Sequence, residues 1–367
     1  MSDRALDLVY ICDWLPPDFG AVGQYALQFA RDEARRGKHV ALYGLSSARS
    51  FEEQEEHGSG TLKIARLHAP VYDRTNLRAR AGWTLKTNLA LVRHALRDMR
   101  EANEVLFTGS PPFLLHLLAP LNLLLRKQLV YRITDFFPEC LMAEYSPPPL
   151  ILRALYRLTL FWRRRVSVLE VLGEDQRRRL VDAGIPGERI RLRRYASPVA
   201  ITPHTNPLSR PAALAGKKVL LYSGNFGVAH EHETFLAAYR RHHRKGSGRI
   251  ALWLNAQGAS ADALERSLKA EVLPFHRTQP VPLEQLASLL ITPDAHLITL
   301  RNEFVGYVLP SKVYGCIDSG KPILYIGSTE SDLHVLCSTK QTPGRYFHAD
   351  VGDEEAVFQM LEKLSQE

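Results

Sequence analysis

The chain has 367 residues, 45% of them hydrophobic, which is long enough for two domains that each bury a core. Its N-terminus lacks the long apolar run and small-residue cleavage site of a secretion signal, and its four cysteines lack metal-like spacing, so we expect a cytoplasmic protein with reduced thiols. Residues 1–200 carry 30 Lys and Arg against 22 Asp and Glu, whereas residues 201–367 carry 17 of each. The first half should therefore meet an anionic partner, such as a phospholipid surface, a lipid diphosphate or nucleic acid.

Short β-branched runs alternate with helical stretches through the first half of the chain. This alternation predicts a mostly parallel sheet with helices on both faces. The predicted strands are Leu8–Cys12, His39–Leu45, Leu62–Leu67, Glu104–Thr108, Gln128–Ile133, Val166–Leu172 and Ile190–Arg194.

The second half repeats the pattern after a segment rich in proline and alanine, Ser197 to Gly216, which we interpret as a linker. We therefore predict an α/β protein of two doubly wound, Rossmann-like domains, residues 1–200 and 201–350. Ligands of such sheets bind at the carboxyl ends of the strands, so we expect a cleft between the domains. The predicted strands of the second half are Lys218–Tyr222, Arg249–Asn255, Val272–His276, Ala295–Leu300 and Pro322–Ile326.

One glycine turn follows the first strand of each half. Gly20 and Gly23 precede an amphipathic helix, and Gly224 with Asn225 lies in YSGNFG before a helix that begins near His230. Glycine lets the backbone approach a ligand closely, and amides at a helix start face an anion. Each turn alone is weak evidence, because strand-glycine-helix also occurs as a simple tight turn.

The segment FVGYVLPSKVYGCIDSGKPI lies between two predicted strands near the end of the second half. Pro310 pre-sets a helical turn and Ser311 can cap it, so the amides of Lys312 and Val313 can face an anion beside the Lys312 ammonium. The alternative is a capped helix without a ligand. Together with the two glycine turns, the segment predicts a site for a sugar nucleotide diphosphate.

The chain resembles the retaining sugar-nucleotide glycosyltransferases of the GT-B fold, family 4, and within them the fucosyl- and acetamidofucosyl-type transferases of bacterial polysaccharide biosynthesis. The resemblance covers nearly the whole chain. It rests on the Gly20/Gly23 loop, TGSPPF, ITDFFPE, LGEDQRRRLVDAGIPGERI, YSGNFG and LPSKVYGCIDSGKPI.

The resemblance implies that the second domain binds the nucleotide and the first the acceptor. Ser311, Lys312 and the Gly224–Asn225 turn would hold the diphosphate, Gly20 and Gly23 would close from the other domain, and the helix at 353–365 would cross back to the first domain. Backbone from Gln279 to Val281 would meet the nucleobase. The implied donor is foremost a UDP-sugar, with GDP or dTDP as alternatives, and the acceptor a glycan or polyprenyl-diphosphate-linked sugar.

Four positions depart from the family pattern. Asn225 and His230 stand where many members have an arginine and a lysine, which leaves Lys312 and a second cation only if His230 is charged. Gly315 stands where many members place a ribose-binding glutamate, a role for which Glu303 or Asp332 is the substitute. Ser110 replaces the usual acceptor-side histidine.

Asp135 ends a predicted strand, so we place it near the anomeric carbon, with Glu139 as second choice. Asp135 orients the acceptor hydroxyl or takes its proton late, or it merely caps a turn. In the family's mechanism the leaving diphosphate itself helps to deprotonate the acceptor. No residue cluster has metal-ligand spacing, and we expect transfer without a metal or cofactor, with Lys312 and helix dipoles supplying positive charge.

Ser146 to Arg165 is apolar around most of a helix, with a stripe of arginines and aromatic residues near its end, which is typical of a helix in a membrane interface. The alternative is a helix that covers the sheet, and for Phe113 to Leu125 we favour that alternative. We thus expect an anionic membrane surface as partner, on the inner face of the cytoplasmic membrane.

Three rival functions differ in class. Nucleic-acid binding fits the basic pI of about 9.3, but no aromatic platform accompanies the basic residues and the phosphate turns would be unexplained, so we expect no nucleic acid. A sugar-nucleotide epimerase of the same fold and a non-catalytic nucleotide-sugar-binding protein both remain open.

Overall fold

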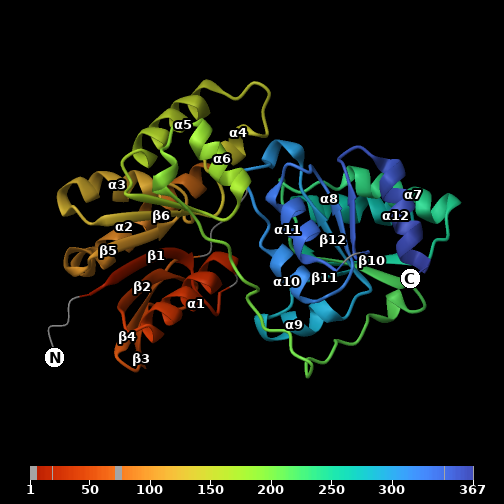
Figure 1. Ribbon diagram of the computed structural model, residues 1–367, viewed down its shortest axis with the longest axis horizontal. Helices are drawn as coiled ribbons and strands as arrows, with labels where there is room; N and C mark the ends of the chain where they lie inside the picture. Colours follow the sequence, from red (N-terminus) through yellow and green to blue (C-terminus); the bar gives the residue numbers. More distant parts are fainter. Residues whose placement is uncertain (1–5, 19, 71–76, 343, 367) are drawn as a thin grey trace. The chain divides into compact units, whose positions relative to one another are not determined.

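The computed structural model describes residues 6–18, 20–70, 77–342 and 344–366. The chain divides into two compact units, Met1–Arg194 and Tyr195–Glu367 (Figure 1). This division lies six residues before the boundary expected at residue 200. Most of the predicted linker is irregular, and its Arg210 pairs with Asp294 of the second unit.

The described part of the first unit holds an eight-stranded sheet in the order β3-β4-β2-β1-β5-β6-β7-β8, parallel except for β3. Leu8, Tyr10 and Cys12 of β1 pack with one apolar cluster while Val9 and Ile11, on the opposite side, are also fully buried. Burial of both faces is the condition that a parallel sheet requires. The strands are β1 Leu8–Trp14, β2 His39–Ser46, β3 Phe51–His57, β4 Gly60–His68, β5 Glu104–Thr108, β6 Gln128–Ile133, β7 Val168–Val171 and β8 Ile190–Leu192.

Helices connect these strands across both faces of the sheet (Figure 1). The bounds are α1 Ala21–Arg35, α2 Leu77–Glu101, α3 Leu114–Leu125, α4 Glu139–Met142, α5 Leu150–Arg163 and α6 Glu174–Asp182. None of the helices in the described residues is long and apolar enough to cross a membrane.

Strand β3 was not predicted, because its sequence FEEQEEH is charged rather than apolar. It pairs antiparallel with β4 through a hairpin, and its glutamates are held by arginines: Glu55 by Arg31 and Glu53 by Arg66. β3 is an exposed edge strand, and charged side chains on such a strand hinder its pairing with other chains. This explains the charged composition of β3.

The second unit holds, within its described residues, a parallel six-stranded sheet in the order β11-β10-β9-β12-β13-β14. The four-residue β14 was not predicted. The strands are β9 Lys218–Asn225, β10 Ile250–Gln257, β11 Phe275–Thr278, β12 Ala295–Thr299, β13 Ile323–Ile326 and β14 Tyr346–Ala349. The helices are α7 Glu233–Lys245, α8 Ala259–Ala270, α9 Leu283–Ile291, α10 Lys312–Asp318, α11 Asp332–Lys340 and α12 Glu354–Gln366.

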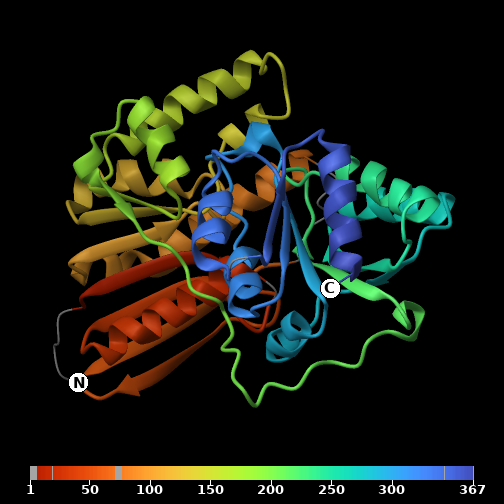
Figure 2. The same cartoon turned by 45° about the vertical axis from the view of Figure 1, so that its right-hand side comes forward.

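The C-terminal helix α12 does not cross back to the first domain, contrary to the expectation from the resemblance. It packs beside α7 in the second unit (Figure 2), and Val357, Leu361 and Leu364 lie in that unit's main core. Its Glu362 also accepts hydrogen bonds from the amide of Ser247. The apolar face of α12 therefore already has a partner within its own unit.

Candidate active site

Lys312 begins α10, close to the turn that ends β9. A Cβ atom added to Gly224 would lie 3.9 Å from Lys312 Cε, so the two predicted phosphate turns do meet in the second unit. Gly224 has a φ of +110°, a conformation that favours glycine. Gly224 lies at the carboxyl end of β9 and Lys312 follows β12, and ligands of parallel sheets bind at such strand ends.

The Lys312 ammonium is buried without a hydrogen-bond partner among the described residues. Its Nζ lies 3.4 Å from the centroid of the Tyr222 ring, and burial lowers the pKa of Lys312 to about 7. A buried polar group without a partner is costly and needs an explanation in a native protein. An anionic ligand at the Gly224 turn would supply the missing partner.

His230 lies beside this lysine but does not act as a second cation. Its Nδ1–H donates to the carbonyl of Thr299 at 2.7 Å, and its ring contacts Tyr222 and Phe226 edge-on. Burial, and then the charge of Lys312, lower the pKa of His230 to about 3. His230 is therefore neutral near pH 7, which corrects the possibility of a charged His230.

The start of α10 contributes less to anion binding than the sequence suggested. Ser311 has helical dihedral angles and makes no capping hydrogen bond through its side chain. The amide of Val313 donates to the Pro310 carbonyl at 3.2 Å instead of facing outward. Because α10 has only seven residues, its dipole is short, and the charge of Lys312 is the main attraction that the segment offers.

Asn225 ends β9 and Gln279 follows β11, with β10 between these two strands in the sheet, and both residues are exposed. The Gln279 carbonyl accepts a hydrogen bond from Asn255 Nδ2 at 2.6 Å, which fixes the backbone where a nucleobase was expected. Val281 packs against a core cluster with Leu289 and Trp253, so its side chain supports the loop.

Packing around Gly315 favours a residue without a side chain at the position where a carboxylate was expected. A Cβ atom there would lie 2.8 Å from Leu290 Cδ1 of α9, so any side chain at this position would require the Leu290 side chain to move. Of the two proposed substitutes, Asp332 is only 2% exposed at the start of α11. Glu303 is exposed in the loop after β12, 3.5 Å from Arg301 Nε, and is the carboxylate still open to a ligand.

Gly20 and Gly23 differ in what they do in the first unit. Gly20 is the N-cap of α1 in an extended conformation, while Gly23 lies inside the helix rather than before it. A Cβ atom on Gly23 would fall 1.8 Å from the Trp14 carbonyl oxygen. Gly23 is thus required for α1 to pack against the end of β1, and ligand contact is not needed to explain it.

Asp13, which sequence reasoning missed, lies at the end of β1. Ser110 Oγ donates to Asp13 Oδ2 at 2.6 Å, and Asp13 Oδ1 is buried with no hydrogen-bond partner in the described residues. Burial raises the pKa of Asp13 to about 7 against the lowering effect of the Ser110 hydrogen bond, and the Asp135 charge raises it further. The sequence signal that could have identified Asp13 is its position directly after the predicted first strand, where ligands of parallel sheets bind.

Asp135 follows β6, as predicted, at the same sheet edge as Asp13. Desolvation raises the pKa of Asp135 to about 6, even though part of its side chain is exposed. The edge thus carries two carboxyl groups whose pKa values are raised above the usual range by desolvation. The combination suits binding or deprotonation of a hydroxyl group.

Glu139, the second choice beside Asp135, has a structural role instead. Its carboxylate pairs with Arg163, and the two side chains are 8% and 1% exposed. Arg163 also donates to the Phe137 carbonyl at 3.1 Å. The carboxylate is thus committed to holding α4 and α5 together.

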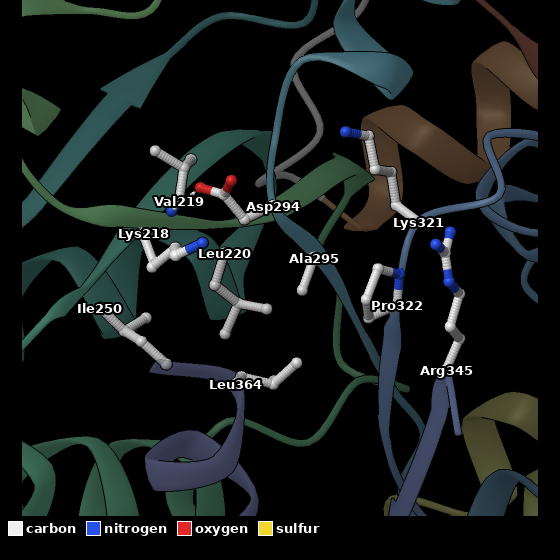
Figure 3. A pocket seen from close by; sticks show the side chains of 10 residues that line it. All are labelled: Lys218, Val219, Leu220, Ile250, Asp294, Ala295, Lys321, Pro322, Arg345 and Leu364. Carbon is white, nitrogen blue, oxygen red and sulfur yellow. Dashed lines mark hydrogen bonds between the residues drawn. The ribbon is translucent and has the colours of Figure 1, made fainter. Parts of the chain in front are cut away.

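A cavity of about 270 Å³ lies at the opposite edge of the second sheet (Figure 3). It opens where β9, β10 and β12 begin, at Lys218, Ile250 and Ala295. Its carboxylate, Asp294, is already held by Arg210 and by the amide of Val219. The cavity is therefore separate from the Lys312 site. No group of three or more potential metal ligands occurs in the described residues.

Solved structures share the architecture. Trehalose-6-phosphate synthase from E. coli, bound with UDP-2-fluoro glucose, matches with a TM-score of 0.66 and 12% identity over 98% of this chain and 91% of that chain. WaaG, a glycosyltransferase involved in lipopolysaccharide biosynthesis, matches with a TM-score of 0.61 and 16% identity over 98% of this chain and 90% of that chain. HepE from Anabaena, in complex with UDP and glucose, matches with a TM-score of 0.65 and 10% identity over 98% of this chain and 89% of that chain.

These similarities show that the chain has the GT-B fold of two parallel-sheet α/β domains. No protein-family model matches the sequence, and no curated protein matches it significantly.

Proposed function

We propose that the protein is a retaining, hexosyltransferase-type glycosyltransferase that moves a sugar from a nucleotide diphosphate sugar, foremost a UDP-sugar, to a glycan or lipid-linked acceptor of bacterial surface polysaccharide. The buried Lys312 ammonium, for which the described residues supply no hydrogen-bond partner, is the observation that carries the proposal. The bound UDP-sugar and UDP of two structural neighbours support a donor of that kind.

Lys312 would neutralise the charge that develops on the leaving diphosphate. A fixed cation in a site poor in water stabilises such charge strongly, and it does so without reorganising during the reaction. Gly224 would let the backbone approach the phosphates, because it carries no side chain beside Lys312. Glu303 is the carboxylate we assign to the donor's ribose.

Asp135 and Asp13 would bind the acceptor hydroxyl in the first domain. The leaving diphosphate would take the acceptor proton, and Asp135 would orient the hydroxyl or receive the proton late. We propose that no metal or cofactor is needed, because Lys312 already supplies a positive charge. Full activity in excess EDTA is the expected result, and loss of activity that Mg²⁺ restores would contradict it.

A thermal-shift screen against UDP, GDP, dTDP, ADP and CMP tests the donor site. A ligand at 100 times its Kd that binds only the folded protein stabilises it by about 2.7 kcal/mol. We expect UDP to give the largest shift in the wild type and Lys312→Met to reduce it by half or more, because UDP binding that is about 10- to 100-fold weaker leaves only about 1.4 to 0.4 kcal/mol of stabilisation at the same UDP concentration. Equal shifts in both proteins would remove Lys312 from the site.

A product assay separates the transferase from its rivals. A transferase releases free nucleoside diphosphate when an acceptor is supplied, together with a glycosylated product whose anomeric configuration matches the donor. An epimerase converts the donor without an acceptor, and a non-catalytic binding protein releases nothing. NMR of the product's anomeric proton distinguishes retention from inversion.

A further inference from the structure

The outward face of α5 is apolar, which is unusual for a helix on a domain surface. Leu150 and Ile151 are each 77% exposed, and Leu158 and Phe161 are also exposed. With 100° per residue, these four side chains fall on one side of the helix. At the end of the adjacent helix α3, Leu124 is 82% exposed. Together with Arg153, Arg157 and Arg164, the four α5 side chains are called the α5 face below.

The rotation of α5 is fixed by polar contacts on its other side. The buried Thr159 hydroxyl meets His116 Nε2 of α3 at 3.1 Å, and the buried Arg163 pairs with Glu139. These contacts hold α5 against α3 and α4 (Figure 1). The apolar side chains cannot turn inward without breaking them, so their exposure follows from the fold.

Arginines border the apolar side chains. Arg153, Arg157 and Arg164 are exposed and lie along one edge of the α5 face, and Arg164 also donates to the Ala183 carbonyl at 2.9 Å. Arg165 lies 3.5 Å from the Phe161 ring. An apolar stripe with a basic edge complements the acyl chains and phosphate groups of an anionic bilayer. The excess positive charge of residues 1–200 acts in the same direction.

We infer that the α5 face docks on an anionic phospholipid bilayer, lying in the interface without spanning it. Docking of the α5 face would place the protein at the membrane that holds a lipid-linked acceptor. Only this link to the acceptor rests on the proposed function. The bilayer would cover Leu150, Ile151, Leu158 and Phe161, while the arginines contact lipid phosphates.

Co-sedimentation of the full-length protein with vesicles tests this inference. We expect binding to phosphatidylcholine vesicles rich in phosphatidylglycerol, at most weak binding to pure phosphatidylcholine, and release at high salt. Ile151→Ser with Leu158→Ser should lower binding at least ~10-fold, because two apolar side chains leave the bilayer. Arg153→Gln with Arg157→Gln should lower it by about fivefold for each arginine.

Two control variants remove basic or apolar side chains that lie outside the α5 face. Arg244→Gln with Lys245→Gln makes the same charge change at the end of α7, and Val272→Ser removes an apolar side chain that is 89% exposed in the second unit. We expect wild-type binding from both. The inference is overturned if wild type does not sediment, if the α7 pair loses as much binding as the α5 pair, or if the α5 variants bind normally.

Self-association is the competing explanation for an apolar face. Sedimentation velocity should show the same oligomeric state for wild type and Ile151→Ser/Leu158→Ser. A wild-type dimer that this variant dissociates would assign the face to a second copy and overturn the inference. The UDP thermal shift of the α5 variants should equal that of wild type, so failure of vesicle binding stays separate from failure of the donor site.

Discussion

Lys312 is a basic residue whose Nζ atom is buried with no hydrogen-bond partner in the part of the chain that the structure describes. Its lowered pKa means that part of the free protein carries a neutral Lys312 near pH 7. A bound diphosphate favours the charged form, because an opposite charge nearby raises the pKa of an amine. Donor binding and protonation of Lys312 should therefore be coupled.

Lys312→Met should weaken nucleotide binding by about 10- to 100-fold, the range expected for losing a charged contact. Calorimetry of UDP binding at pH 8, in buffers of different ionisation enthalpy, should show uptake of a proton by the wild type and less uptake by the variant. Equal proton uptake in both proteins would contradict coupling through Lys312.

Stability should respond to pH in the same way. The folded-state pKa of Lys312 is about 7, below the usual value, so between pH 7 and roughly 10 the unfolded chain binds a proton that the folded chain does not. This group therefore makes the free protein more stable as pH rises through that window. Lys312→Met should remove that part of the slope in urea unfolding.

The pKa shift of Asp13 changes the stability of the protein with pH in the opposite direction. Its folded-state pKa of about 7 lies above the usual value of roughly 4, so ionisation in the folded protein lowers stability as pH rises from about 4 to 7. Asp13→Asn keeps an oxygen that accepts from Ser110 and removes the buried charge. We expect the variant to be more stable than wild type by on the order of 2 kcal/mol at pH 8, and to differ little at pH 4.

Asp13→Asn should also lose transferase activity, whereas a purely structural residue would keep it when stability rises. Thermal melts at pH 4 and pH 8, combined with rates, check both outcomes. Ser110→Ala is the companion variant, because it removes the donor while leaving the carboxylate in place. A variant that is less stable than wild type at pH 8 would contradict the burial argument.

At the scale of elements, the buried pair of Arg163 and Glu139 ties α5 to the segment after β6. Removing one partner leaves a buried charge uncompensated, so Arg163→Met should cost about 3–5 kcal/mol in urea unfolding. Arg163→Met combined with Glu139→Gln should cost clearly less, because neither charge remains. If the two variants are equally destabilised, the pair is not the cause.

At the scale of the whole molecule, each unit has its own apolar core, so each should unfold as a unit. Calorimetry of the full chain should show two transitions, and UDP should raise only one of them. A fragment of residues 195–367, which keeps α12, should reproduce the UDP-sensitive transition. A fragment of residues 195–352 should not fold, because the core would lose Val357, Phe358, Leu361 and Leu364.

Local sequence patterns are sufficient to predict most strands, the two-domain α/β organisation and the meeting of the Gly224 and Lys312 turns. These features are recorded locally, as apolar runs, glycines and a Pro-Ser-Lys helix start, and parallel strands bring their carboxyl ends to one edge. The charged β3 and the short β14 carry too weak a local signal.

The tertiary packing sets what those residues contact. It placed Ser110 against Asp13 across 97 positions, put Leu290 where a side chain of Gly315 would lie, buried His230 as a neutral ring and packed α12 on α7. It also turned the apolar side of α5 outward. Burial, and with it pKa and partner, depends on which faces of distant elements pack together, and no local pattern in the chain specifies that.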